Sequence, residues 1–144
     1  MSSHPLYLAF IWHMHQPYYR DLRTGECMMP WVRLHATKDY LDMVKLLGEF
    51  PSLHQTFNLV PSLLDQLQAY LPPNNHTDSF LDLSRKPASD LTEEEKGFLL
   101  AWFFLANWDH MVRPHPRYHD LLIRRGTTRP ITPQDYAHLQ VWFH

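Results

Sequence analysis

The most informative stretch of the sequence is Leu6-Tyr-Leu-Ala-Phe-Ile-Trp12, which is followed directly by His13-Met-His-Gln-Pro-Tyr18. Its first part is a nearly continuous run of apolar residues that suit a β-strand. Such runs are typical of strands that are buried on both faces of a parallel sheet. The second part is polar and prone to turns. The sequence therefore predicts a buried strand over residues 6–12 and a loop over residues 13–30 at its carboxyl end.

The segments after this loop predict a βαβα unit. Residues 37–50 carry apolar side chains at three-to-four spacing, which indicates a helix, and Pro51 ends it. Residues 54–58 predict a second short strand. Residues 61–70 predict a second helix, because a proline suits the first helical position and a pair of prolines follows the last one. Parallel strands joined by a right-handed crossover are the default for this order of elements.

The second half of the chain predicts helices rather than strands. Thr92 and Glu95 form a capping-box pattern that opens a helix to about residue 107. A further helix is expected over residues 116–125, and a similar cap at Thr132 opens a last one. The large aromatic residues of this half are interpreted as core: Trp102, Phe103, Phe104 and Trp108. Two arginines near a helix end suit the helix dipole and need no ligand: Arg124 and Arg125.

This layout predicts an α/β domain that is not finished. The β/α units occupy about residues 6–71, and a helical segment occupies about residues 78–144. Two parallel strands cannot form a covered sheet by themselves, since their outer edges stay open. The last predicted helix also has no stop signal. We therefore expect residues 1–144 to be the N-terminal portion of a larger, truncated domain.

The composition narrows the class of protein. The 144 residues are 44% hydrophobic and 19% charged, which is typical of a globular chain, and the formal net charge is −2. That balance gives no basic patch for nucleic acid and no attraction to an anionic membrane. The single cysteine, Cys27, excludes an intrachain disulfide and suits a reducing compartment. The N-terminus lacks a signal-peptide pattern, so a cytoplasmic protein is expected.

A pair of histidines follows the first predicted strand. Ligands bind at the carboxyl ends of strands in parallel α/β sheets and barrels. His13 and His15 are two residues apart, so an extended backbone points both rings to the same side. Three interpretations are open: hydrogen bonding to a polar ligand such as a sugar, ligation of a metal, or structural capping of the strand end. The metal interpretation needs a third ligand, for which the sequence offers no compact motif.

Five blocks of the sequence together resemble glycoside hydrolase family 57. The first is Ala9-Phe-Ile-Trp-His-Met-His-Gln-Pro-Tyr18, which contains the His-Gln-Pro core of that family's first signature region. The others are Trp31-Val-Arg-Leu-His-Ala-Thr-Lys-Asp-Tyr40, Gln55-Thr-Phe-Asn-Leu-Val-Pro-Ser-Leu-Leu64, Phe103-Phe-Leu-Ala-Asn-Trp108 and His115-Pro-Arg-Tyr118.

The resemblance implies a fold and an activity. Members of that family degrade or rearrange α-glucans, as α-amylases, amylopullulanases, 4-α-glucanotransferases or branching enzymes. Their catalytic domain is an incomplete (β/α)7 barrel related to the deacetylase barrels. They retain anomeric configuration and use a Glu nucleophile and an Asp acid/base, which retention places about 5–5.5 Å apart. Both carboxylates belong to signature regions beyond this chain. The parent enzyme is therefore expected to be active and this chain alone inactive, with no catalytic residue of its own.

The resemblance also implies the site residues and the partner. His15 is expected to contact the reacting sugar. His13, Gln16, Trp31 and Asn58 are the further candidates for substrate binding. Gln16 equally suits turn support. Trp31 also suits a core or lid role, which is more common for a tryptophan at a helix approach, and Asn58 also suits a cap of the loop before Pro61. The expected partner is an α-glucan or maltooligosaccharide, with no metal or other cofactor. Two rivals remain: a metal-dependent deacetylase or hydrolase that uses the histidine pair, and a non-catalytic carbohydrate-binding chain.

Overall fold

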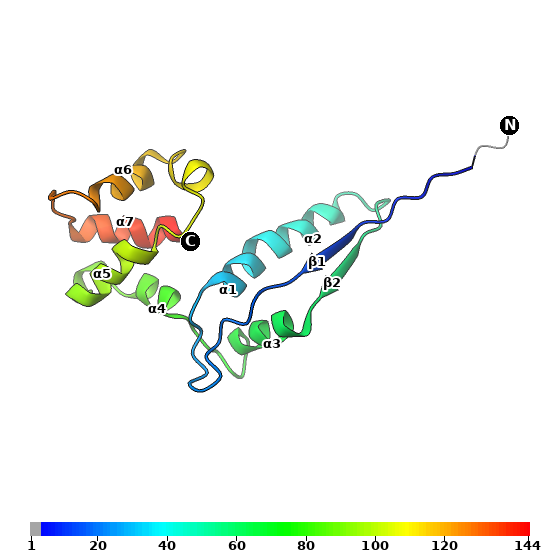
Figure 1. Cartoon of the computed structure of the whole chain (residues 1–144), viewed down its shortest axis with the longest axis horizontal. Coiled ribbons are helices and arrows are strands. Elements are labelled where there is room, and N and C mark those ends of the chain that lie inside the picture. Colours follow the sequence, from blue (N-terminus) through cyan, green and yellow to red (C-terminus); the bar gives the residue numbers. More distant parts are fainter. Residues whose placement is uncertain (1–3) are drawn as a thin grey trace. The chain divides into compact units, whose positions relative to one another are not determined.

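A computed structural model describes residues 4–144, which fold as two compact units that divide between Asp78 and Ser79 (Figure 1). The first unit contains the sheet and the second is helical. Together they give the mixed α/β content that the sequence predicts. Within residues 4–144, no helix has the length and apolar character that crossing a membrane requires.

The first unit is built on two parallel strands, β1 (Ile11–Met14) and β2 (Thr56–Leu59). In their register Trp12 lies opposite Phe57, and His13 lies opposite Asn58. The predicted parallel pairing is therefore confirmed. The first strand begins later than predicted and includes His13, which the sequence assigned to the loop. The second begins two residues later and ends one residue later than the predicted segment.

A continuous helical stretch connects the strands. It consists of α1 (Trp31–His35), a π-helical turn η1 (Ala36–Tyr40) and α2 (Leu41–Gly48). The predicted helix began only at residue 37. The earlier start follows from tertiary packing, because Val32 is 2% exposed and lies in the core of this unit. After β2, α3 (Pro61–Tyr70) has the predicted bounds, with Val60 as an extended N-cap.

Within residues 4–144, helices cover only one face of the two-stranded sheet. Met14 packs there with Val32 and Leu63 in the small core of the unit. Side chains alternate along a strand, so Ile11 and His13 point to the opposite face. Ile11 is 69% exposed. The prediction of a strand buried on both faces is therefore wrong, because burial of both faces needs a second covering layer.

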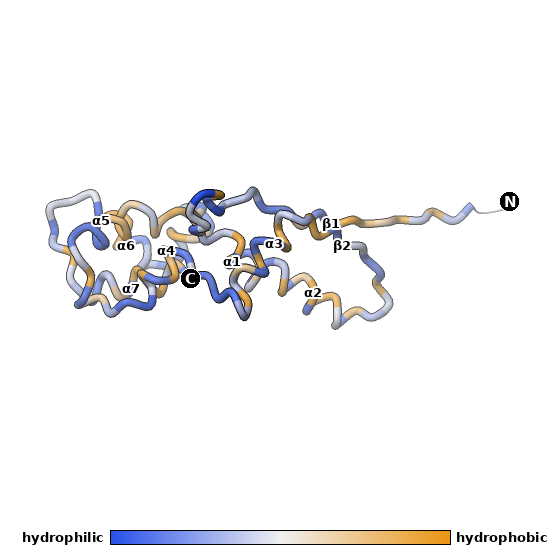
Figure 2. Tube along the Cα trace, turned by 90° about the horizontal axis from the view of Figure 1, so that it is seen from below, coloured by the Kyte–Doolittle hydropathy of each residue, from blue (hydrophilic) through white to orange (hydrophobic). Residues whose placement is uncertain are grey.

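Apolar side chains remain exposed along the first unit. The run before β1 lies outside the strand, and its large apolar side chains are exposed: Leu6, Tyr7, Leu8 and Phe10. Helix α2 has no buried side chain. Figure 2 shows apolar positions along both segments. A hollow of about 300 Å³ lies between the helix and the covered face of the sheet, lined by Trp12, Met43, Leu46, Leu47, Phe50, Leu53, Gln55 and Phe57.

The second unit consists of helices only. They are α4 (Ser79–Arg85), the 3-10 turn η2 (Ala88–Asp90), α5 (Glu93–Trp102), the π-helical turn η3 (Trp108–Val112), α6 (Pro116–Arg124) and α7 (Pro133–Phe143). Both predicted helix caps are confirmed as complete capping boxes, Thr92 with Glu95 and Thr132 with Asp135.

The second unit has an aromatic core. The ring of Phe103 stacks on those of Phe80 and Phe143, with centroids 5.6 Å and 4.5 Å apart. Phe103 and Phe104 are buried as predicted, whereas Trp102 and Trp108 are each 42% exposed, so the prediction of core is wrong for the two tryptophans. Helix α5 ends at Trp102, five residues earlier than predicted, where these two phenylalanines enter the core.

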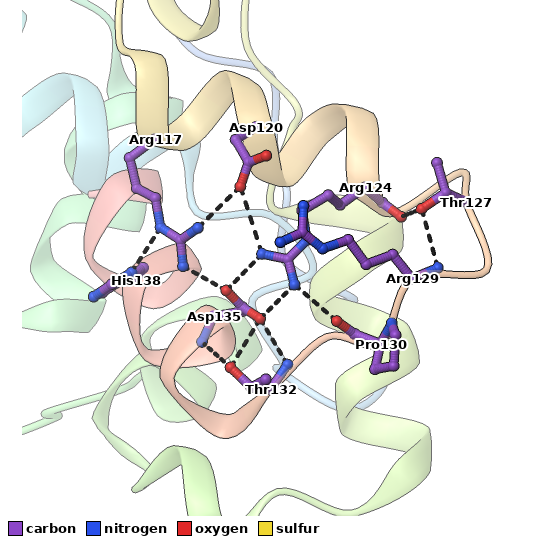
Figure 3. Close-up of polar contacts among 9 residues, drawn as sticks. All are labelled: Arg117, Asp120, Arg124, Thr127, Arg129, Pro130, Thr132, Asp135 and His138. Carbon is purple, nitrogen blue, oxygen red and sulfur yellow. Dashed lines mark hydrogen bonds and ion pairs between the residues drawn. The ribbon is translucent and has the colours of Figure 1, made fainter.

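A buried ion cluster joins α6 to α7 (Figure 3). Arg124 is 8% exposed and donates hydrogen bonds to both carboxylate oxygens of Asp135, at 2.9 Å and 2.8 Å. Arg117 also pairs with Asp135, and it donates to Asp120 at 2.9 Å. The sequence prediction for Arg124 did not include this partner, a carboxylate on another helix. Burial by itself raises the pKa of the Asp135 carboxyl, but hydrogen bonds from Arg124 and Thr132 outweigh it and hold that pKa well below its usual range.

Candidate functional site

The histidine pair lies at the carboxyl end of β1, on the face of the sheet that no helix covers. The rings of His13 and His15 are nearly parallel, with centroids 5.9 Å apart and an interplanar angle of 11°. Both side chains are exposed. The extended backbone thus points both rings to one side, as the spacing predicts. Two imidazoles are therefore presented together to whatever occupies this face.

Asn58 joins the pair from the neighbouring strand. It lies directly opposite His13 in the parallel register. Its Nδ2 atom is 3.1 Å from the Nδ1 atom of His13. An amide group that donates to Nδ1 leaves the proton of a neutral imidazole on Nε2. The outer nitrogen of His13 then acts as a donor toward this exposed face, which suits a hydroxyl or carbonyl oxygen.

A buried glutamine of α3 holds the loop that follows the histidines. Gln66 is 2% exposed. Its side-chain oxygen accepts from the Tyr19 amide at 2.7 Å, and its side-chain nitrogen donates to the carbonyl oxygens of Pro17 at 3.0 Å and Ser62 at 2.9 Å. A buried amide with all these partners fixes the path of the loop. The sequence prediction missed Gln66, although a polar residue on the buried stripe of α3, between Leu63 and Ala69, was a usable signal.

Tyr40 fixes the same loop from the other side. Its hydroxyl donates to the His15 carbonyl oxygen at 3.2 Å and accepts from the Gln16 side-chain nitrogen at 3.1 Å. The Tyr19 hydroxyl donates to the Gln16 side-chain oxygen at 3.4 Å. Both ends of the Gln16 amide are thus engaged inside the protein. This arrangement favours the turn-supporting interpretation of Gln16 over a direct contact with substrate.

Trp31 is connected to the site through other aromatic side chains. It is the first residue of α1, and its side chain is half-buried. Its ring centroid is 6.4 Å from that of His35, which is 6.3 Å from that of Tyr40. His35 also forms a hydrogen bond with Asp39. The aromatic row therefore ends at Tyr40, the residue that holds the His15 carbonyl, and a direct contact of Trp31 with a sugar stays a prediction.

The polar residues near the loop include one further pair. The Tyr18 hydroxyl donates to a carboxylate oxygen of Asp65 at 2.8 Å, and this hydrogen bond raises the pKa of Tyr18. Among residues 4–144, no group of three or more His, Cys, Asp or Glu side chains is arranged to hold a metal ion. The part of the chain that the structure describes therefore supplies the histidine pair without a third protein ligand.

The comparisons with known proteins agree with the sequence blocks. The sequence model for glycosyl hydrolase family 57 matches residues 9–132, which is most of the chain. Searches of curated proteins and of solved structures found no significant match. The matched range contains both strands, the histidine pair, Gln66 and Tyr40. The chain therefore belongs to glycosyl hydrolase family 57.

Proposed function

We propose that this chain supplies substrate-binding residues to an enzyme that hydrolyses or transfers α-glucans. In this proposal the first unit forms the opening β/α units of an incomplete (β/α)7 barrel, and an α-glucan or maltooligosaccharide binds at the carboxyl ends of its strands. Membership of glycosyl hydrolase family 57 supports the carbohydrate class of substrate. The parallel strands with a connecting helix support the barrel, because βα units are its building blocks.

One observation carries the proposal: the joint placement of His13, His15 and Asn58 on the uncovered face of the sheet. In a (β/α) barrel the helices lie outside, so the face without helices is the one that turns inward. The carboxyl end of that face is where barrel enzymes bind their substrates. The imidazole and amide groups can donate to and accept from sugar hydroxyls without a formal charge.

In the proposed mechanism these residues bind and orient the substrate but do not react. The donor nitrogen of His13 and the ring of His15 fix a glucose unit by its hydroxyl groups. The Glu nucleophile and the Asp acid/base come from residues outside this chain and flank the scissile bond at about 5–5.5 Å, as retention requires. Ile11, an exposed apolar side chain on the uncovered face, supports further barrel units that bury it.

The proposal is tested by binding of maltotriose to the 144-residue chain, followed through the ring signals of the histidines by NMR. We expect maltotriose to shift the signals of His13 and His15. The double substitution His13→Ala and His15→Ala is expected to weaken binding about tenfold or more, the effect of losing two hydrogen bonds. His54→Ala is the matched control, because His54 is exposed and precedes β2 at the opposite end of the strands.

Two results would count against the proposal. Maltotriose that leaves both ring signals unchanged would contradict sugar binding at this face. Turnover of maltooligosaccharides by the isolated chain would contradict the placement of the carboxylates outside it. The metal-dependent rival predicts a stoichiometric metal that the double substitution removes, so metal analysis of the purified protein and its variant separates that rival from our proposal.

A further inference from the structure

The first unit has a second polar feature, a hollow at the end of α3. It has a volume of about 140 Å³ and is lined by Arg20, Asp65, Gln68, Ala69, Asn74 and His76. These residues come from the loop after the histidine pair, from α3 and from the segment that follows it. We propose that this hollow is a second saccharide-binding subsite, and this inference rests on the proposed function.

Several groups around the hollow have hydrogen-bonding capacity to spare. Among the residues that the structure describes, the side chains of Gln68 and His76 have no hydrogen-bond partner. One carboxylate oxygen of Asp65 accepts from Tyr18, which leaves the other open. The side-chain nitrogen of Asn74 donates to the Gln68 carbonyl oxygen at 3.1 Å, which leaves its side-chain oxygen open. The hollow of about 140 Å³ is therefore lined by both acceptors and donors that a small polar ligand could use.

The walls of the hollow are held in place by contacts behind them. The His76 amide donates to the Ala69 carbonyl oxygen at 2.8 Å, which fastens the segment after α3 onto the helix. Buried Asp78, two residues later, accepts from Arg33 at 2.9 Å and from the Tyr70 hydroxyl at 3.1 Å. Burial and the adjacent carboxylate raise the pKa of Tyr70. A site that is fixed before binding loses less entropy when a ligand arrives.

The charges of the hollow favour a neutral ligand with several hydroxyl groups. The lining contains one guanidinium, Arg20, and one carboxylate, Asp65, and its other polar groups are amides and an imidazole. A small anion would meet the Asp65 carboxylate, and a cation would meet Arg20. Planar carboxylate, amide and guanidinium groups can each bond two neighbouring hydroxyls of a sugar ring.

The position of the hollow relates it to the histidine pair. Only the loop from His15 to Arg20 separates the two, and five residues span at most about 18 Å when fully extended. Gln66 and Tyr40 hold this loop in one path. An oligosaccharide of a few rings is long enough to span this distance. Two linked contacts would raise the affinity for longer chains over that for a single sugar.

The test uses the isotope-labelled 144-residue chain and maltotriose as the probe. We expect maltotriose to shift the side-chain amide signals of Gln68 and Asn74 in addition to the histidine rings. The double substitution Gln68→Ala and His76→Ala is expected to weaken binding about fivefold to tenfold. These two side chains have no hydrogen-bond partners in the described structure, so we expect the double variant to keep the fold. Gln134→Ala combined with His54→Ala is the matched control.

The outcomes separate this inference from the proposed function. Shifts at His13 and His15 without shifts at Gln68 and Asn74 would overturn the subsite and leave the proposed function standing. Shifts at the hollow alone would support the subsite and contradict the role of the histidines. Absence of shifts at both places would overturn both. Parallel titrations with inorganic phosphate and with glycine test the ligand class, and a response to either one without a response to maltotriose would overturn the saccharide assignment.

Discussion

The two units of this chain differ in the size of the core that each one buries and in whether a sheet face stays uncovered. The second unit encloses an aromatic core around Phe103 and a buried ion cluster around Asp135. The first unit buries a small core of Met14, Val32 and Leu63 and leaves one face of its sheet open. Helices satisfy their backbone hydrogen bonds internally, whereas a two-stranded sheet has open edges. The helical unit therefore forms its core without sheet edges to cover, whereas the α/β unit presents a polar site beside exposed apolar residues.

The largest expected effect is a loss of stability of the second unit. Asp135→Ala leaves two arginines of the buried cluster without their shared carboxylate, and removal of one partner of a buried ion pair costs about 3–5 kcal/mol of the free energy of unfolding. Denaturant unfolding combined with hydrogen exchange measures this loss. We expect it to appear in the helices from α4 to α7 and to leave the exchange of β1 and β2 unchanged.

The matched control for that substitution is Asp109→Ala. Asp109 pairs with Arg113 on the surface, where the two side chains are 67% and 57% exposed. Solvent screens such pairs, so their removal has little effect on stability. Equal losses for the Asp135 and Asp109 variants would contradict the assignment of the buried cluster as the structural centre of the second unit.

The next expected effect is a loss of stability in acid that belongs to the same carboxylate. The pKa of Asp135 is lowered in the folded protein, whereas an unfolded Asp has a pKa near 3.9. A lowered folded pKa stabilises the protein above the unfolded pKa, and this stabilisation is lost as pH falls below about 4. Glu95, whose pKa is lowered by its hydrogen bond with Lys86, adds in the same direction.

Unfolding of the second unit at pH 7 and at pH 3 measures this dependence. We expect Asp135→Asn to be less stable than the natural chain at pH 7 but to lose less stability between the two pH values. The contribution of Glu95 remains in that variant, so a slope remains. The same acid sensitivity in the natural chain and in the variant would show that Asp135 does not carry the effect.

The smallest of the three effects sharpens the description of the first unit. Gln66→Ala leaves the Pro17 carbonyl and the Tyr19 amide without their partner, and an unsatisfied buried group costs about 1–3 kcal/mol. We expect faster hydrogen exchange of the Tyr19 amide and weaker binding of maltotriose. Gln68→Ala on the same helix is exposed and should change the stability by less than about 0.5 kcal/mol. Similar losses of stability for both variants would remove the special role of Gln66.

The elements that the sequence predicted well have their signals within a few neighbouring residues. The bounds of α3 follow from a proline at its first position and prolines after its end. The capping boxes at Thr92 and Thr132 each depend on residues three apart. The common direction of His13 and His15 follows from the period of an extended backbone. In each case one short segment contains the physical cause.

The predictions that failed depend on partners far away in the chain. Trp102 and Trp108 are large apolar residues of the kind found in cores, but the rings of Phe80 and Phe143 from other helices pack around Phe103 instead. Burial of Arg124 depends on the carboxylate of Asp135 on another helix. Nothing in the local pattern around these residues shows whether their side chains are buried or exposed, so propensity alone could not predict their burial.

Three features could be predicted from the sequence alone: the family, the parallel pairing of the two strands and the common direction of the histidine pair. Each of them depends on a local motif or on the period of the backbone. Two features became visible only in the tertiary structure. Asn58 contacts His13, and Gln66 and Tyr40 hold the loop that follows the histidine pair. These contacts join residues that are far apart in the chain. Hydrogen bonds of that kind form only when the whole unit packs, since packing sets their distances and excludes the competing water.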